Sequence, residues 1–130
     1  MITFELDSEH DVPVWTTRVR PVLGARCLAR TVEIFVLMKS AASIEPTPDR
    51  HTVRVGFDQE PDVTEQWDAS IDSQALFAPD GSTLGRRIAR ARVMRFGFTP
   101  FHASAVEAQF DVRGFDKPLE SVIRTCGMKS

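Results

Sequence analysis

Apolar and polar residues alternate along much of this chain with the two-residue period of β-strands. Residues 27–38 form the first clear strand, and one of its faces carries four apolar side chains: Val32, Ile34, Val36 and Met38. The other face also holds Phe35 and Leu37, so we expect burial on much of both sides. Residues 51–58 repeat the alternation and direct three apolar side chains inward: Val53, Val55 and Phe57.

The segments between these strands have loop composition. Residues 40–50 are rich in Ser and Pro, and residues 59–65 contain a further Pro, which cannot donate to a strand ladder. Residues 66–77 alternate less regularly, and they predict two short strands interrupted around residues 71–73.

A hairpin is predicted near the C-terminus. Residues 93–98 and 106–112 both alternate, and the turn between them centres near Phe101. This register would set Arg95 beside Glu107 on the exposed face of the hairpin.

The period changes to that of a helix in two places. Pro79, Asp80 and Gly81 predict a turn, after which Ser82 or Thr83 caps a short helix over residues 82–91. Its apolar stripe consists of Leu84, Ile88 and Ala91.

The second helix is predicted over residues 116–126. Asp116 would cap it, Pro118 fits its first turn, and Gly127 would end it. The spacing of its apolar residues follows one helix face: Leu119, Val122, Ile123 and Cys126.

Strands, a helix, a hairpin and a final helix, in that order, predict an α+β fold. We expect a mostly antiparallel, twisted sheet of about six to seven strands with both helices packed on it. Residues 1–13 would form an N-terminal arm or edge strand, and residues 14–130 one domain with a real core.

Composition and charge exclude some classes of protein. The net charge of −2 leaves no electrostatic footprint for DNA or RNA over the whole chain, so we expect no nucleic-acid partner. No apolar run approaches the ~18–20 residues that a transmembrane helix requires. The apolar fraction of 42% and the charged fraction of 26% describe an ordinary globular domain.

The two cysteines, Cys27 and Cys126, lie near opposite ends of the chain, each in a segment predicted to be ordered. Cys27 would open a buried strand, and Cys126 falls on the buried stripe of the last helix. A disulfide between them would close a loop worth about 4–5 kcal/mol in the chain-entropy model. It would persist in an oxidising compartment and rarely in cytosol. The alternative is a pair of free, buried thiols.

The N-terminus bears on the compartment. Residues 1–15 lack the basic start and the apolar stretch of a signal peptide. A periplasmic or envelope location therefore requires that Met1 replaces a removed leader. The alternative is a cytoplasmic or virion protein with reduced thiols.

Residues that could carry chemistry are scattered. His10, His51 and His102 show no metal-ligand spacing, and the cysteines have another predicted role. Ser70 and Ser73 lie beside Asp72, but no nucleophile elbow frames either serine. We therefore expect no enzyme, no metal and no cofactor.

The candidate binding residues fall in two groups. Arg86, Arg87 and Arg90 begin a run of arginines that could bind an acidic partner or could form a solvated helix face. The segment 58–73 is the other candidate, with Trp67 as either a core residue or a partly exposed anchor. Its polar candidates are Asp58, Ser70 and Asp72.

An ordered series of short motifs spans residues 14–126. It runs P-V-L-x-A-R-C (21–27), T-V-E-I-F-V (31–36), V-R-V-G-F-D (53–58), W-D-A-S-I-D-S-Q-A-L-F (67–77), L-x3-I-A-R-A (84–91), A-x-F-D-V-R-G-F (108–115) and L-x2-V-I-x-T-C (119–126). This series resembles the VasI/TagO family of accessory proteins associated with bacterial type VI secretion.

The resemblance implies an envelope-directed, non-enzymatic protein with an assembly-related role. It also implies an oxidised Cys27–Cys126 pair and a protein partner, and it supplies no catalytic residues. A second class remains open, namely a structural or host-inhibiting protein encoded by a phage or another mobile element.

Overall fold

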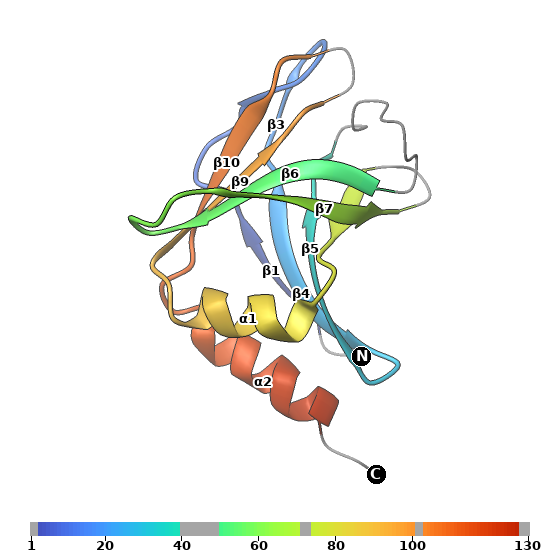
Figure 1. Cartoon of the computed structure of the whole chain (residues 1–130), viewed down its shortest axis with the longest axis vertical. Helices are drawn as coiled ribbons and strands as arrows, with labels where there is room; N and C mark the ends of the chain where they lie inside the picture. The colour runs from blue at the N-terminus through green and yellow to red at the C-terminus, as the bar shows by residue number, and fades with distance from the viewer. Residues whose placement is uncertain (1–2, 40–49, 71–73, 101–102, 128–130) are drawn as a thin grey trace.

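The computed structural model describes residues 3–39, 50–70, 74–100 and 103–127, and it shows an α+β fold (Figure 1). A large antiparallel sheet of eight strands carries two helices at one end. The predicted fold class is confirmed, while the predicted strand count was low.

The eight strands of the large sheet are β1 (Thr3–Asp7), β4 (Val22–Leu28), β5 (Thr31–Leu37), β6 (Arg50–Phe57), β7 (Val63–Ala69), β8 (Ala75–Phe77), β9 (Val93–Phe98) and β10 (Val106–Asp111). They lie in the order β1-β4-β5-β8-β7-β6-β9-β10. A separate two-stranded ribbon contains β2 (Val12–Pro13) and β3 (Arg18–Val19), and the helices are α1 (Gly81–Ala89) and α2 (Asp116–Gly127).

The large sheet curls until its two edges come close together. The chain leaving edge strand β1 reaches the other edge strand, β10, where the Glu9 amide donates to the Gln109 carbonyl at 2.8 Å. The Gln109 side-chain amide also donates to a Glu9 carboxylate oxygen at 3.2 Å. This closure protects backbone groups that an open sheet edge would expose.

The core fills the inside of the curled sheet. The inward residues predicted from the alternation in β5 and β6 are buried there, which confirms the assignment of the faces of these two strands. Trp67 of β7 has no exposed surface and packs against Phe96 of β9, with ring centroids 4.9 Å apart. The strands therefore supply a continuous apolar interior.

The helices close one end of this interior. Leu119 and Val122 of α2 are completely buried, and so is Ile88 of α1. The first helix packs on β5 and on α2, while α2 packs on β4 and β5. Figure 1 shows the two helices running side by side below the sheet.

A disulfide joins Cys27, near the end of β4, to Cys126 in the last turn of α2. The two residues are 99 positions apart in sequence, and their Cα atoms are 5.4 Å apart. The bond therefore fixes the C-terminal helix to the sheet, and the expected pairing is present.

The single strand predicted over residues 27–38 was wrong in its bounds. Residues 27–38 do not form a continuous strand, because the chain reverses at Ala29 and Arg30, with φ angles of 51° and 65°. Cys27 pairs with Val32 across this hairpin and so lies near the end of β4 instead of opening a strand. Two successive positive φ angles are typical of a two-residue hairpin turn.

The predicted contact between Arg95 and Glu107 is also wrong. In the observed register Arg95 faces Gln109, and Glu107 faces Gly97. The Arg95 guanidinium instead forms an ion pair with Asp62 at 3.0 Å and donates to the carbonyls of Asp58 and Glu60 at 2.6 and 2.8 Å. Arg95 thus holds the β6–β7 turn against β9.

Two predicted element ends shift as well. Helix α1 is capped by Asp80, whose carboxylate accepts from the Thr83 amide, so neither Ser82 nor Thr83 is the cap. Strand β7 starts at Val63, inside the segment predicted as a loop. The predicted loop 40–50, apart from residue 50, and the interruption at 71–73 lie outside the described residues, as does Phe101.

Candidate binding surface around helix α1

Helix α1 stands as a ridge with a hollow on each side. Its buried residues include Leu84 and Ile88, which anchor it on the sheet. Gly81 brings the start of the helix so close to the Val32 carbonyl that a Cβ atom there would clash with it. The helix is therefore held tightly, and its remaining faces are turned toward the two hollows.

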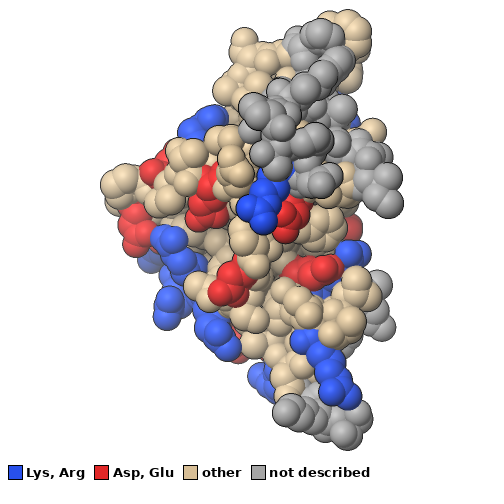
Figure 2. Space-filling model, turned by 45° about the vertical axis from the view of Figure 1, so that its right-hand side comes forward, with Lys and Arg blue, Asp and Glu red and all other residues tan. Residues whose placement is uncertain are grey.

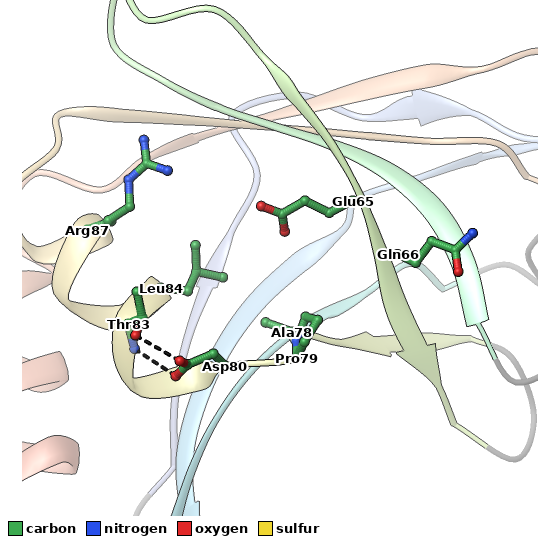
Figure 3. Close-up of a pocket in the computed structure, with 8 residues that line it drawn as sticks. All are labelled: Glu65, Gln66, Ala78, Pro79, Asp80, Thr83, Leu84 and Arg87. Carbon is green, nitrogen blue, oxygen red and sulfur yellow. Dashed lines mark hydrogen bonds between the residues drawn. The ribbon is translucent and has the colours of Figure 1, made fainter.

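The hollow between α1 and β7 has a volume of about 290 Å³, and we call it the paired hollow. Its lining residues are Glu65, Gln66, Ala78, Pro79, Asp80, Thr83, Leu84 and Arg87. Figure 3 shows Glu65 reaching from β7 toward α1, across from Arg87 and Leu84, while Gln66 points away from that space.

Each charged group of the paired hollow has a partner. The Trp67 indole donates to Glu65 at 2.9 Å, which turns the carboxylate toward the buried ring. Arg87 forms an ion pair with Glu60 at 2.7 Å, and its guanidinium lies 4.6 Å from the centre of the Phe57 ring. These contacts fix the charged side chains in place.

Asp80 is held by the helix that it caps. Its carboxylate accepts from the Thr83 amide at 3.1 Å and from the Thr83 hydroxyl at 2.9 Å. The bond from the Thr83 amide, and after it the bond from the Thr83 hydroxyl, lower the pKa of Asp80 below its ordinary value. Asp80 is therefore an ionised cap at neutral pH.

Asp58 has a similar structural role beside a smaller hollow of about 110 Å³. One carboxylate oxygen accepts from the amides of Arg92 and Val93 at 2.9 and 3.0 Å. These two hydrogen bonds lower the pKa of Asp58. The residue joins the end of β6 to the start of β9 and has a positive φ of 49°.

On its other side, α1 faces α2 across a hollow of about 400 Å³, lined by Arg86, Ala89, Arg90, Glu120, Ile123 and Arg124. A second hollow of about 330 Å³ is lined by Arg30, Thr31, Val32, Ser82, Arg86, Ile123, Cys126 and Gly127. Because both include Arg86 and Ile123, we treat them as one feature, the arginine furrow.

The charges of the arginine furrow differ from those of the paired hollow. Its four arginines, all exposed, are Arg30, Arg86, Arg90 and Arg124. Within the described part of the chain, their side chains form no ion pair and donate no hydrogen bond. Glu120 is the acidic residue among the lining side chains. The furrow is therefore a local basic surface on a chain of net charge −2.

The wider surface shows the same separation of charge. In Figure 2 most Lys and Arg side chains on the visible face lie along its lower part, at the level of the helices. Asp and Glu side chains cross the middle of that face. The helical end is thus the more basic end of this view.

The structure assigns different roles to the binding residues that the sequence proposed in segment 58–73. Trp67 is completely buried, so the exposed-anchor alternative is wrong and the residue belongs to the core. The Ser70 hydroxyl accepts from the Ala75 amide at 3.1 Å, where β7 gives way to β8. Asp72 lies outside the described residues.

The arginine run also separates, because neighbouring residues of a helix point about 100° apart. Arg86 and Arg90 line the arginine furrow, whereas Arg87 lines the paired hollow. Sequence reasoning missed Arg30 and Arg124, which come from a hairpin turn and from α2. Their shared sign was visible in the sequence, but only the tertiary fold shows that they lie together.

The described residues contain no candidate metal site and no candidate membrane-spanning helix. In that part of the chain, His, Cys, Asp and Glu do not gather in groups of three or more that could hold a metal ion. The two helices, of nine and twelve residues, are too short and too polar to cross a bilayer.

Comparison of the chain with protein-family models, with curated proteins and with solved structures finds no match. The resemblance to the VasI/TagO family therefore stays a prediction.

Proposed function

We propose that this protein is a non-enzymatic, protein-binding accessory module of the bacterial cell envelope. The observation that carries the proposal is the surface around α1, where hollows of about 290 and 400 Å³ open on either side of one firmly anchored helix. A ridge between two hollows offers a partner both shape and charge to recognise.

The chemistry of this surface supports binding instead of catalysis. Asp58 and Asp80 are engaged by backbone amides, and these hydrogen bonds move their pKa values further below neutral pH. A general acid or base works best with a pKa near the operating pH. These carboxylates therefore suit a structural role.

The Cys27–Cys126 disulfide supports the compartment. Disulfides persist in the periplasm and outside the cell, and they are rare in the cytosol. The resemblance to the VasI/TagO family favours the same location and a role in assembly of a secretion system.

Two measurements test the proposal. The first is the thiol state of natively expressed full-length protein, from intact mass after alkylation, with and without reduction. We expect an oxidised, intramolecular pair. Two alkylated thiols would contradict the envelope location and favour the phage-encoded or cytosolic alternative.

The second measurement is photo-cross-linking in the native host. A photoreactive residue at Thr83 reports on the paired hollow, and one at Ala89 reports on the arginine furrow. Glu107, exposed on β10, is the control position. We expect a discrete cross-linked protein from α1 and none from the control. The absence of a cross-link at both positions of α1 would contradict the proposed binding function.

A further inference from the structure

We infer that the arginine furrow binds an acidic peptide segment of a partner protein, with carboxylates on its arginines and an apolar side chain over Ile123. The inference rests on the proposed binding function and adds the place and the chemistry of recognition.

The first support is that the arginines of the furrow are available. Elsewhere among the described residues, five arginines form ion pairs with acidic residues: Arg26 with Glu33, Arg50 with Asp68, Arg87 with Glu60, Arg95 with Asp62 and Arg113 with Asp111. The four arginines of the furrow have no such partner within the residues that the structure describes. A guanidinium is a planar set of donors that fits a carboxylate through two hydrogen bonds.

The second support is the way these charges come together. Arg86 lies on α1 and Arg90 is the residue that caps its C-terminal end, while Arg124 comes from α2 and Arg30 from the turn between β4 and β5. Three separate elements thus direct the same charge toward one channel. The four arginines outnumber Glu120, the acidic residue of the furrow lining, so like charges repel one another there, and a ligand of opposite charge relieves this repulsion.

The third support is shape. The two hollows of the furrow, of about 400 and 330 Å³, share Arg86 and Ile123 and therefore adjoin one another. Val32, Ala89 and Ile123 give this channel an apolar floor between the arginines. A peptide with both acidic and apolar side chains matches this pattern of charged rim and apolar floor.

The same features favour a peptide over a polyanion. A nucleic acid needs a longer basic track for its regularly spaced phosphates, whereas this chain has a net charge of −2 and an acidic residue within the furrow itself. Glu120 inside the furrow would also repel a continuous row of phosphates. Discrete carboxylates separated by apolar residues avoid both conflicts.

The test begins with a displayed library of random short peptides selected against the oxidised full-length protein. Selection is repeated against the double variant R86E/R90E, and against R18E as the matched control. Arg18 lies on β3, at the end of the molecule away from the helices in Figure 1, and its substitution makes the same change per residue. We expect the wild type and R18E to enrich peptides with Asp or Glu beside apolar residues.

Fluorescence anisotropy then measures binding of the most enriched peptide and of its Asn/Gln counterpart. We expect R86E/R90E to weaken binding at least about tenfold, with R18E unchanged within about twofold. The milder variant R86Q/R90Q should weaken binding less, and it serves if the charge reversal disturbs folding, which circular dichroism would show. Affinity for the acidic peptide should fall as salt is raised.

Several outcomes would overturn the inference. They are enrichment of peptides without acidic residues, no enrichment at all, equal binding of the Asn/Gln peptide, and tighter binding of single-stranded DNA or of vesicles containing phosphatidylglycerol. Cross-linking keeps the two proposals apart. If a cross-link forms from Ala89 but survives in R86E/R90E, the binding function stands and the acidic-peptide inference fails.

Discussion

The two sides of α1 present similar residues in opposite states. In the paired hollow, Arg87 lies between Glu60 and the Phe57 ring, and Glu65 and Asp80 are each held by hydrogen bonds. In the arginine furrow, Arg86 and Arg90 extend from the same helix with no ion pair inside the described residues. Charge on the first side is part of the fold, and charge on the second side is available to a ligand.

This difference shows that a run of like charges in a sequence does not tell which of them are paired in the fold. Arg86 and Arg87 are neighbours, but the helix turns one toward α2 and the other toward β6 and β7. Experiments that disturb one side and spare the other therefore test whether the two sides are as separate as the structure shows.

The largest expected effect comes from removing the disulfide with C27A/C126A. The chain-entropy model gives a loss of about 4–5 kcal/mol in the free energy of unfolding, measured by denaturant titration. Because the bond ties α2 to β4, hydrogen exchange should increase more in α2 than in β7 and β8. Equal increases on both sides would show that the furrow does not depend on the tether. Reduced wild-type protein is the control for the substitutions themselves.

The substitution Trp67→Ala tests the side of the paired hollow, where Trp67 holds Glu65. Truncating this completely buried side chain should cost roughly 3–5 kcal/mol of unfolding free energy, because it removes packing against Phe96 and the hydrogen bond to Glu65. Trp67→Phe keeps an aromatic ring and should cost less. At a temperature where W67A is folded, its affinity for an acidic peptide should equal that of the wild type. A loss of affinity would mean that the two sides are coupled.

Arg87→Ala and Arg86→Ala form the closest matched pair. R87A should lower the free energy of unfolding by about 1 kcal/mol, since it removes a partly exposed ion pair and a cation–π contact. R86A should change it by less than about 0.5 kcal/mol, because Arg86 is exposed and forms no ion pair in the described part of the chain. Peptide binding should respond in the reverse order. Equal losses of stability would contradict the division of charge described above.

The smallest expected effect is a change in how steeply stability falls at low pH. Folding lowers the pKa of Asp58 and Asp80 below 3.8, so their stabilisation is present above that pH and is lost as pH falls through the folded values. Asp111, whose pKa falls to about 2 through its hydrogen bonds with Arg113, extends the same window downward. Asp80→Asn should flatten the loss of melting temperature below pH 4 relative to the wild type, as measured by calorimetry. An unchanged loss of stability at low pH would show that the cap does not titrate as expected.

Alternation and helical period were sufficient to predict the fold class and most element positions, because burial of one strand face or one helix stripe leaves a regular pattern. The β4–β5 hairpin escaped prediction for a definite reason. Its turn contains Ala29 and Arg30 at positive φ instead of the Asn-Gly or Asp-Gly pair that usually marks such a turn. The alternation therefore appeared to continue through it.

The candidate site was predictable only in part. Arg86, Arg87 and Arg90 could be selected from their clustering on one short helix. Their division between two hollows depends on where α1 packs, and the addition of Arg30 and Arg124 depends on contacts between distant segments. The pairing of Arg95 with Asp62 instead of Glu107 has the same origin, because strand register sets which side chains meet.

The disulfide between Cys27 and Cys126 also affects how the protein would respond to mechanical load. A force pulling on the two ends of the chain would pass through the covalent bond and bypass the residues between the cysteines, which are 99 positions apart. Only segments outside the bond, such as β1 and most of β4, could be peeled away. Extension of the enclosed chain, on the order of 300 Å when fully drawn out, would require reduction of the bond first. In its oxidised form the protein could therefore lengthen under load only through the residues outside the bond.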